Sequence, residues 1–592
     1  MFMKKAQHIL ILMAAIACLS SCAFKGNDSL SGSDALTWTT WNGYDNFFSL
    51  LNEKCPDITL DFVSYTGANQ TGYSWEQLRA DDITDIFITS QILDEDLASE
   101  RLVDLSGYDF INNFSNSILD QVAVDGGIYL LPVNYTMYGI YYNKTLMEEK
   151  GWELPGDFSE LESLCEEIRK EGLIPGVIGT QLTGNTFSAV FNLAKTSWLT
   201  TPEGLKWERE FLAGNATAEG MWEGTMDYVQ RYLDMGMFTV DPEDRNNPEI
   251  ILDYLGNRKA VFCTQVLAVN ITEFPENGDK LGMMPYIGED GSKNIYMYSP
   301  SNYIGISRRL TEPGNEKKLE NAIRLLSLLY SREGQEMFIT NETPCMMSVL
   351  DNKVSEDTLI YDAQQALKEG RAFPMTYAGW EGVLSDMGQA YKDWFRGENG
   401  MDGPKCIARM DELQNGYLSR SGERIFGEAV EDFTLEETAE LLGKALGSAV
   451  GADAVMVPLG VYRTGNVRLK SGVTGKLYAG EVGIEKVNMI MPGVSGEYAM
   501  MTMTGKQAME LAKTGLDTAG EDAEPFPYVL VTKGSKKLKD SETYQVAFFM
   551  QGYTEEVGRT YSVVVYEGAL RDFLIAWMKE QKTVKPGQNP WN

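Results

Sequence analysis

Apolar and polar positions alternate in two ways along the first long block of the chain. Ile58, Leu60 and Phe62 are separated by polar residues, a spacing that predicts a half-buried strand. Residues 85–89 (DIFIT) hold an apolar run between polar ends, which is typical of a buried parallel strand. Such strands alternate with helical patterns from residue 36 to about residue 419, which predicts an α/β layer protein.

Two helices are clear in this block. Asp157 stands three residues before Glu160, the spacing of a capping box at a helix start. The residues that follow place one apolar face at helical spacing: Leu161, Leu164, Cys165 and Ile168. A second helix, ending near Gly334, has the same spacing at Leu319, Ala322, Ile323, Leu326 and Tyr330.

The pattern starts afresh after residue 419. Thr434 and Glu437 form another capping box, and the helix after them carries one apolar face. A strand over residues 452–457 and a turn before a further helix follow. Residues 420–592 are therefore expected to form a separate α/β (or α+β) domain.

The first 34 residues are typical of a leader followed by a tether. Two lysines precede an apolar run over residues 9–17, which is too short to span about 30 Å of hydrocarbon. The next residues, 19–22 (LSSC), resemble the lipobox of bacterial lipoproteins, which implies a signal peptide at 1–21 and a lipid such as palmitate on Cys22. A plain secretory signal is the alternative. Residues 22–34 are small and polar, as in a flexible tether.

The composition is that of an ordinary globular protein, but the charge is strongly negative. The 592 residues correspond to about three or four folding units. Lys and Arg number 51 against 85 Asp and Glu, which gives a net charge of −34. A surface this negative repels phosphate backbones and anionic lipid headgroups, which argues against nucleic acid as a partner.

One histidine, His8, occurs in the whole chain, and it lies in the predicted signal peptide. The mature chain therefore has no imidazole for Ser-His-Asp or Cys-His catalysis, or for most catalytic zinc sites. Carboxylate-pair or Ser-Lys chemistry is still open, but no pair can be picked out among so many acids, so binding is favoured over catalysis. We expect no metal and no cofactor. The cysteines after Cys22 are scattered without C-x-x-C spacing and are interpreted as free, buried thiols: Cys55, Cys165, Cys263, Cys345 and Cys406.

Four motifs in order carry a resemblance to a known family. Residues 139–146 (GIYYNKTL), followed by a capped helix start at 158–161, resemble the extracellular solute-binding proteins of ABC importers, family 1. Residues 256–262 resemble that family's Gly-Lys-Ala-Ala-Met strand entry, residues 285–307 its return strand, and residues 326–335 its Ser-x-Glu-Gly-Gln helix. Each motif is weak alone, but four in order over some 380 residues are specific.

The resemblance implies a two-lobed, hinged periplasmic-binding-protein-like fold of type II over residues 35–415. Its lobes are joined by crossing strands, which we place near Tyr138, Met284 and Met346. Lobe one is then expected at about 35–138 and 284–345, and lobe two at about 139–283 and 346–415.

The cleft between such lobes is expected to hold aromatic rings and polar groups, because a sugar has apolar C–H faces and many hydroxyls. Trp41 and Trp380 are favoured because they stand in polar or glycine-flanked loops. For each aromatic residue, core packing is the alternative. The full set of expected cleft residues is Trp41, Tyr44, Ser90, Gln91, Tyr135, Gln181, Thr186, Thr264, Gln265 and Trp380.

The motif order of residues 420–592 resembles the C-terminal domain of the 5′-nucleotidases, with departures. That family has a glycine-rich turn ending in arginine, where bare backbone approaches phosphate. Here Gly460 and Arg463 are kept, but bulky residues stand between them. The stretch that supplies a base-stacking ring in the family reads PGVS at 492–495 and has no aromatic residue.

The family's catalytic half, a metallophosphatase domain rich in His and Asp ligands, is replaced here by the solute-binding block. The resemblance therefore implies a non-catalytic module. It is expected either to bind a ligand through Arg463 and Tyr553 or to act as a scaffold, and the sequence leaves both open.

The favoured function is a lipid-tethered extracellular receptor, anchored to the cell membrane, that captures a sugar or oligosaccharide and delivers it to ABC permease subunits. One alternative is a surface protein for sensing or adhesion that has lost transport. Another is an exported hydrolase of nucleotides or phosphoesters, which lacks the metal ligands it would need.

Overall fold

The computed structural model describes most of the chain after the leader. The described residues are 34–40, 44–65, 69–92, 95–245, 247–264, 274, 276–289, 291–300, 302–338, 345–349, 359–374, 380, 383–419, 425–459, 462–464, 467–469, 472–490, 497–514, 528–549, 562–568, 570–588 and 591. Four of the predicted functional positions lie outside this set: Cys22, Trp41, Gln265 and Tyr553.

Lobe one is built on a five-stranded sheet of order β2-β1-β3-β14-β6. Its strands are β1 (Leu36–Thr40), β2 (Leu60–Ser64), β3 (Ile86–Thr89), β6 (Leu131–Pro132) and β14 (Tyr303–Ile306). The first three run parallel, and β14 runs antiparallel to β3. Both sequence-predicted strands, at 58–62 and 85–89, are confirmed as β2 and β3. The lobe's main helices are α2 (Asp45–Lys54), α3 (Gln70–Arg79), α4 (Glu95–Arg101), α12 (Glu316–Leu329) and α13 (Arg332–Phe338).

Lobe two has its own five-stranded sheet, of order β10-β9-β11-β8-β12. The strands are β8 (Ile140–Asn143), β9 (Ile174–Ile178), β10 (Thr239–Val240), β11 (Ala260–Thr264) and β12 (Leu281–Met284). Helices cover it: α6 (Lys144–Lys150), α7 (Phe158–Lys170), α8 (Thr183–Ala194), α9 (Pro202–Leu212), α10 (Glu223–Asp234), α15 (Leu384–Arg396) and α16 (Gly403–Ser419). The predicted cap of α7 is present, because the Asp157 side chain accepts a hydrogen bond from the Glu160 amide at 2.9 Å.

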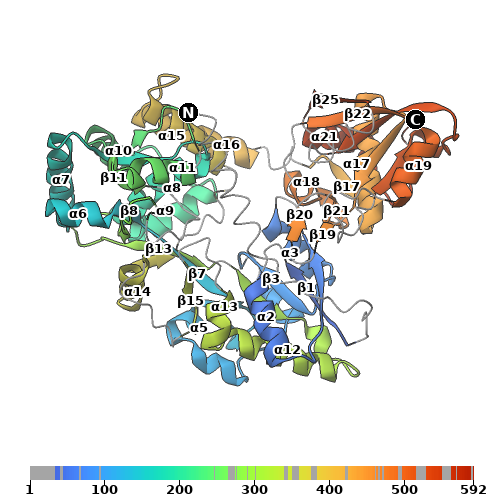
Figure 1. Cartoon of the computed structure of the whole chain (residues 1–592), viewed down its shortest axis with the longest axis horizontal. Coiled ribbons are helices and arrows are strands. Elements are labelled where there is room, and N and C mark those ends of the chain that lie inside the picture. Colours follow the sequence, from blue (N-terminus) through green and yellow to red (C-terminus); the bar gives the residue numbers. More distant parts are fainter. Residues whose placement is uncertain are drawn as a thin grey trace.

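A third, four-stranded sheet joins the lobes, in the order β15-β7-β13-β16. It holds β7 (Asn134–Tyr138), β13 (Tyr296–Pro300), β15 (Cys345–Met347) and β16 (Ala372–Pro374). The chain passes from β7 to β8 through Gly139, where an added Cβ would lie 2.4 Å from the Met284 carbonyl oxygen, so a side chain does not fit. Met284 itself ends β12 in lobe two, and the chain rejoins the sheet of lobe one at β14. Figure 1 shows lobe two at the upper left and the strands β1 and β3 of lobe one at the lower centre, to its right.

The C-terminal unit, residues 425–591, has a separate mixed sheet of order β23-β18-β24-β22-β25. Its strands are β18 (Ala454–Pro458), β22 (Glu497–Thr504), β23 (Tyr528–Thr532), β24 (Thr543–Phe549) and β25 (Ser562–Glu567). The unit has the helices α17 (Leu435–Val450), α18 (Ile484–Ile490), α19 (Gly505–Thr514) and α21 (Leu570–Gln581). Its smaller sheets are made of β17 (Gly427–Ala429), β21 (Gly480–Val482) and β26 (Thr583–Val584), and of the pair β19 (Tyr462–Thr464) and β20 (Val467–Leu469). The capping box of α17 is complete at Thr434 and Glu437, as predicted.

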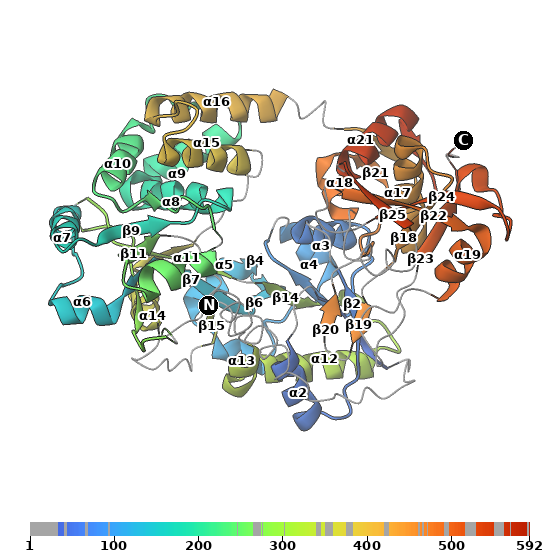
Figure 2. The ribbon, with the colours of Figure 1, turned by 45° about the horizontal axis from the view of Figure 1, so that its top comes forward.

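The C-terminal unit contacts lobe one along α3. The Tyr65 hydroxyl donates to the Met489 carbonyl at 2.8 Å, and its ring stacks on Tyr73 with centroids 4.1 Å apart. Lys486 lies 3.5 Å from Glu76. Both views place α18 next to α3 (Figures 1 and 2). A helix that would otherwise face solvent is therefore covered by the extra domain.

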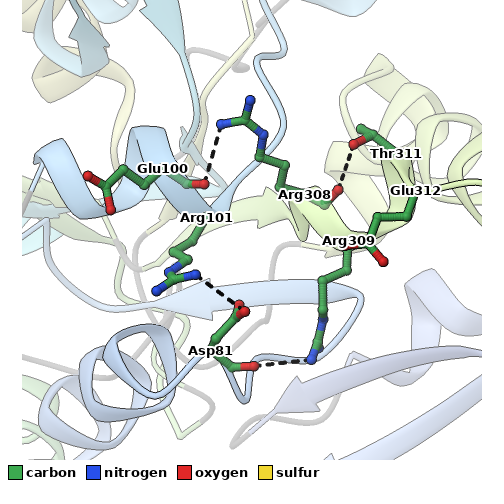
Figure 3. A pocket seen from close by; sticks show the side chains of 7 residues that line it. All are labelled: Asp81, Glu100, Arg101, Arg308, Arg309, Thr311 and Glu312. Carbon is green, nitrogen blue, oxygen red and sulfur yellow. Dashed lines mark hydrogen bonds and ion pairs between the residues drawn. The ribbon is translucent and has the colours of Figure 1, made fainter.

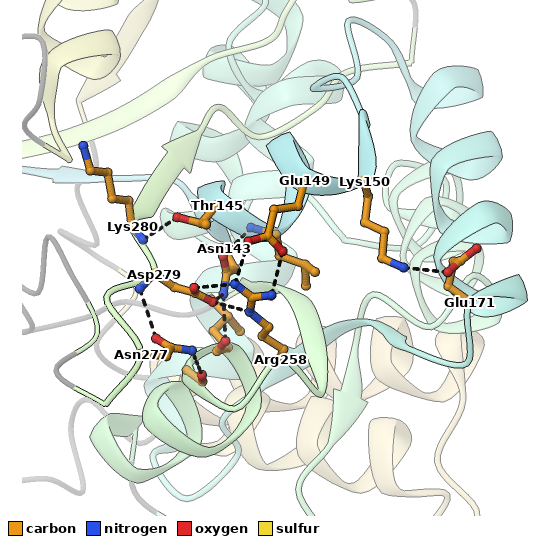
Figure 4. A network of polar contacts seen from close by, with 12 residues as sticks. Asn143, Thr145, Glu149, Lys150, Glu171, Arg258, Asn277, Asp279 and Lys280 are labelled. Carbon is orange, nitrogen blue, oxygen red and sulfur yellow. Dashed lines mark hydrogen bonds and ion pairs between the residues drawn. The ribbon is translucent and has the colours of Figure 1, made fainter.

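Two of the family-like motifs meet in lobe two (Figure 4). Asn143 accepts from the Leu146 amide at 2.8 Å and so caps α6, while its Nδ2 donates to Asp279 at 2.8 Å and to the Leu255 carbonyl at 3.0 Å. Arg258 donates to both oxygens of Asp279, at 2.7 and 2.6 Å. These hydrogen bonds, that of Arg258 above all, lower the pKa of Asp279. The motifs thus stabilise the edge of the lobe-two sheet rather than contact a ligand.

Candidate functional site

Parallel strands bring several predicted site residues to one edge of lobe one. In open α/β sheets, ligands bind outside the carboxyl ends of the strands. Tyr44 follows β1, and Ser90 and Gln91 follow β3; since β1 and β3 are parallel, all three lie at the carboxyl edge. We call this edge the lobe-one edge.

The sheet of lobe two has a corresponding edge. Strands β9, β10 and β11 are parallel, so Gln181, which follows β9, and Thr264, which ends β11, are at the same side of the sheet. Gln181 is exposed, whereas Thr264 is 1% exposed and its hydroxyl has no partner among the described residues. We call this edge the lobe-two edge.

Tyr44 is held firmly at the lobe-one edge. Its ring stacks on Phe338 with centroids 3.9 Å apart, and its hydroxyl accepts a hydrogen bond from Asn302 Nδ2 at 3.4 Å. Asn302 stands immediately before β14 and is buried. Sequence reasoning missed Asn302, although a polar residue directly before a return strand was a usable signal.

The backbone at Gln91 is fixed, while its side chain is not. The Gln91 carbonyl accepts from Trp75 Nε1 at 3.0 Å and from the Thr89 hydroxyl at 2.9 Å. Ser90 is hydrogen-bonded to Thr71 through the two hydroxyls. The side chain of Gln91 is half-buried, and its amide group has no hydrogen bond within the described part of the chain, so this group has the most capacity for a ligand at this edge.

Trp380 does not lie in an open cleft in this structure. The ring is 0% exposed and packs against Phe191 and Phe211, with centroids 5.3 and 5.4 Å away. Its Nε1 donates to Glu208 at 2.9 Å, and Glu208 also pairs with the buried Lys195 at 3.0 Å. The ring lies in the core of lobe two, so Trp380 presents no surface to a ligand in this structure.

Thr186 and Tyr135 also have packing roles. The Thr186 hydroxyl donates to the Gly388 carbonyl at 2.6 Å and so joins α8 to α15, with no surface exposed. Tyr135 lies on β7 in the connecting sheet, where its ring meets Tyr298 edge-on at 5.5 Å and burial raises the pKa of its hydroxyl. Both side chains are buried in this conformation.

A charged network at the lobe-two edge was not predicted. Asp241 directly follows β10 and accepts from Arg245 Nε at 3.1 Å and from an Arg245 terminal nitrogen at 2.8 Å. These bonds lower the pKa of Asp241 to about 2. Asp244 pairs with Lys392 at 2.5 Å and accepts from Thr180, the residue before Gln181, at 2.6 Å. The network therefore fixes the loop that carries Gln181.

Three observations concern metal ligands, membrane-spanning helices and cysteines. Within the described ranges, no group of three His, Cys, Asp or Glu side chains is placed to hold a metal ion. Among the same residues, no helix is long and apolar enough to cross a membrane. The cysteines that the structure describes in side-chain detail are free, and three of them are buried: Cys165, Cys263 and Cys406.

Comparison with known proteins decides the family. Residues 50–361, more than half of the chain, match the family described as bacterial extracellular solute-binding protein. The chain belongs to that family. The predicted α/β, two-lobed periplasmic-binding-protein-like fold is thereby confirmed.

Individual relatives of this solute-binding protein are distant. The "Multiple sugar-binding protein" of Streptococcus mutans is 27% identical over 101 residues, which are 17% of this chain and 24% of the relative, so only about a quarter of its length is matched. MsmE of Bacillus subtilis, in an open conformation, superposes with a TM-score of 0.54 at 12% identity, over 66% of this chain and all of that one. Apo RafE of Streptococcus pneumoniae gives a TM-score of 0.50 at 16% identity, with the same coverage. The two structures share the fold with this chain.

Proposed function

We propose that this solute-binding protein captures a sugar or oligosaccharide between its two lobes and delivers it to an ABC permease. The observation that carries the proposal is the family match over residues 50–361, on a sheet pair whose carboxyl edges hold Tyr44, Ser90 and Gln91 on one lobe and Gln181 and Thr264 on the other. Amide and hydroxyl groups of this kind suit the hydroxyls of a carbohydrate. The sugar-binding name of the Streptococcus mutans relative points the same way.

The remaining parts of the proposal concern the ends of the chain. We place the lipid anchor at Cys22, on the lipobox-like sequence before it, so that the protein is held at the outer face of the cell membrane. Metabolic labelling with a palmitate analogue tests this: a Cys22→Ala variant should lose the label and be released from the membrane.

The C-terminal unit is proposed to be a non-catalytic relative of the 5′-nucleotidase C-terminal domain. A mixed five-stranded sheet in which β18 lies between β23 and β24, with Arg463 on the short strand β19, supports this proposal. Arg463 and Tyr553 are its proposed ligand-binding residues. Phosphatase assays of the purified protein with Mn²⁺, Zn²⁺ or Mg²⁺ should show no turnover above that of an Arg463→Ala control.

A thermal-shift screen against mono- and oligosaccharides tests the main proposal. A sugar present at 100 times its Kd should stabilise the protein by about 2.7 kcal/mol. A saturable shift with at least one sugar is expected. A screen in which nucleosides shift the melting temperature and sugars do not would contradict it.

A further inference from the structure

A second candidate site lies at the other end of the lobe-one sheet (Figure 3). A cavity of about 220 Å³ is lined by Asp81, Glu100, Arg101, Arg308, Arg309, Thr311 and Glu312. Strand β14 is antiparallel to β3 and pairs Ile306 with Ile86, so the arginines that follow β14 lie beside the start of β3. Ser90 and Gln91 follow the opposite end of β3. The cavity is therefore separate from the lobe-one edge.

Three arginines from two distant segments of the chain line this cavity, with Arg308 pointing toward Glu100 and the other two toward Asp81 (Figure 3). An isolated bridge pairs Leu102 with Ser307 and so sets Arg101, at the end of α4, next to Arg308. Arg309 reaches back to the segment before β3, where it donates to the carbonyl oxygens of Asp81, at 3.1 Å, and Ile83. Sheet topology, rather than chance surface side chains, brings the groups together.

The positive charges of the cavity are only partly neutralised. Arg101 alone has a carboxylate partner, Asp81 at 3.3 Å, and its Nε is buried without an acceptor. Arg308 donates a hydrogen bond to the Glu100 carbonyl oxygen at 3.4 Å, and Arg309 likewise donates to backbone carbonyl oxygens. Two guanidinium groups therefore carry a full charge that no carboxylate pairs in the described part of the chain.

Two carboxylates that line the same cavity also have no ion-pair partner among the described residues. Glu100 and Glu312 are exposed and form no ion pair with any residue that the structure describes. An anion would be attracted by the arginines and repelled by these glutamates. A cation would be attracted by the glutamates and repelled by the arginines. A ligand that carries both charges satisfies both sets of groups.

We propose that this cavity binds a small zwitterion, such as an α-amino acid, with its carboxylate at Arg308 and its ammonium at Glu312, the two exposed side chains of the lining that the tests below replace. The volume is below the roughly 300–1,000 Å³ of cavities that take drug-sized ligands, which suits a compact molecule. The site is independent of the proposed sugar site, because it lies at the opposite edge of the sheet.

Isothermal titration of the purified full chain tests the proposal, with a panel of L-α-amino acids, and with acetate and ethylammonium as the two halves of a zwitterion. At least one amino acid should bind saturably, and neither single-charge probe should bind within tenfold of its affinity. Arg308→Gln and Glu312→Gln should each weaken that binding at least tenfold. Both side chains are exposed, so both variants are expected to fold.

Arg409→Gln is the matched control, because Arg409 is a surface arginine of lobe two that pairs with Glu412. It should leave amino-acid binding unchanged, and Arg308→Gln should leave sugar binding unchanged. Absence of binding by every amino acid would overturn the proposal. Inorganic phosphate or acetate binding as tightly, with dependence on Arg308 alone, would also overturn it in favour of a simple anion site.

Discussion

The Lys476 ammonium lies 2.6 Å from a carboxylate oxygen of Asp82, and this ion pair joins the C-terminal unit to the end of α3 in lobe one. The Tyr478 hydroxyl donates to the same oxygen at 3.0 Å. Together with the Tyr65–Met489 hydrogen bond, these contacts run the length of α3. The extra domain is therefore attached to one lobe, and we expect it to move with lobe one when lobe two closes.

Charge reversal at this contact should loosen the C-terminal unit. In Lys476→Glu, two carboxylates would face each other, and we expect faster hydrogen exchange of the α3 amides. The effect on the free energy of unfolding should be small, about 1 kcal/mol, because both partners are partly exposed. Adding Asp82→Lys should restore most of the protection. Lys539→Glu, at an exposed pair within the C-terminal unit, is the control and should leave α3 unchanged. Equal exchange in the wild type and Lys476→Glu would contradict the docking role.

Asn143 should be a strong determinant of lobe-two stability. Asn143→Ala removes the cap of α6 and leaves the buried Asp279 short of one donor, so a loss of about 1–3 kcal/mol is expected from chemical denaturation. Asn257→Ala removes an exposed side-chain amide that donates to Asp253, and the variant should lose less than about 0.5 kcal/mol of unfolding free energy. Similar losses of stability in both variants would show that the hydrogen bonds of Asn143 in Figure 4 contribute no more to stability than a surface contact does.

The depressed pKa of Asp241 predicts an acid-dependent loss of stability. Because Arg245 holds this pKa at about 2 in the folded state, below the usual 3.8, the stabilisation is present above pH 4 and is lost as the pH falls towards 2. The contribution is about 2 kcal/mol. Denaturation curves recorded between pH 5 and pH 2 should therefore fall less steeply for Asp241→Asn than for the wild type. Parallel curves for the two proteins would contradict the assignment.

Trp380→Ala should unfold lobe two rather than act only on ligand binding. Removing a fully buried indole from the cluster around Phe191 and Phe211 should cost about 3–5 kcal/mol. Trp380→Phe should recover much of this loss in thermal denaturation. A Trp380→Ala protein with unchanged stability would indicate that the ring is not a core element in solution.

Gln91→Ala tests the lobe-one edge directly. If the free amide contacts the sugar, its removal should lower sugar affinity by about tenfold, the worth of one hydrogen bond, with an unchanged melting temperature of the free protein. Gln389→Ala, on the exposed side of α15, is the control and should bind as the wild type does. Unchanged affinity in Gln91→Ala would remove this residue from the site.

Local sequence patterns predicted the elements well, because spacing alone determines which face of a strand or helix is apolar. The runs at 58–62 and 85–89, and the caps at Asp157 and Thr434, are present as expected. Strand ends were equally informative: Tyr44 and Gln91 follow the strands β1 and β3, and the parallel pairing of these strands sets both residues at one sheet edge.

Side-chain direction could not be predicted in the same way. Trp380 stands between Gly379 and Gly382 in the sequence, yet its ring lies in the core, where Glu208 supplies a partly buried acceptor 172 positions earlier in the chain. Thr186 was expected in the cleft and lies in α8, where Gly388 allows close approach of α15. Such contacts depend on partners distant in sequence, which no local pattern contains.

The most direct test of the central proposal is isothermal titration of the intact protein with purified oligosaccharides, paired with small-angle scattering of the same samples. We predict saturable binding of one sugar per chain, accompanied by a smaller radius of gyration as the lobes close. Absence of heat with every sugar, or binding that leaves the scattering curve unchanged, would contradict capture between the two lobes.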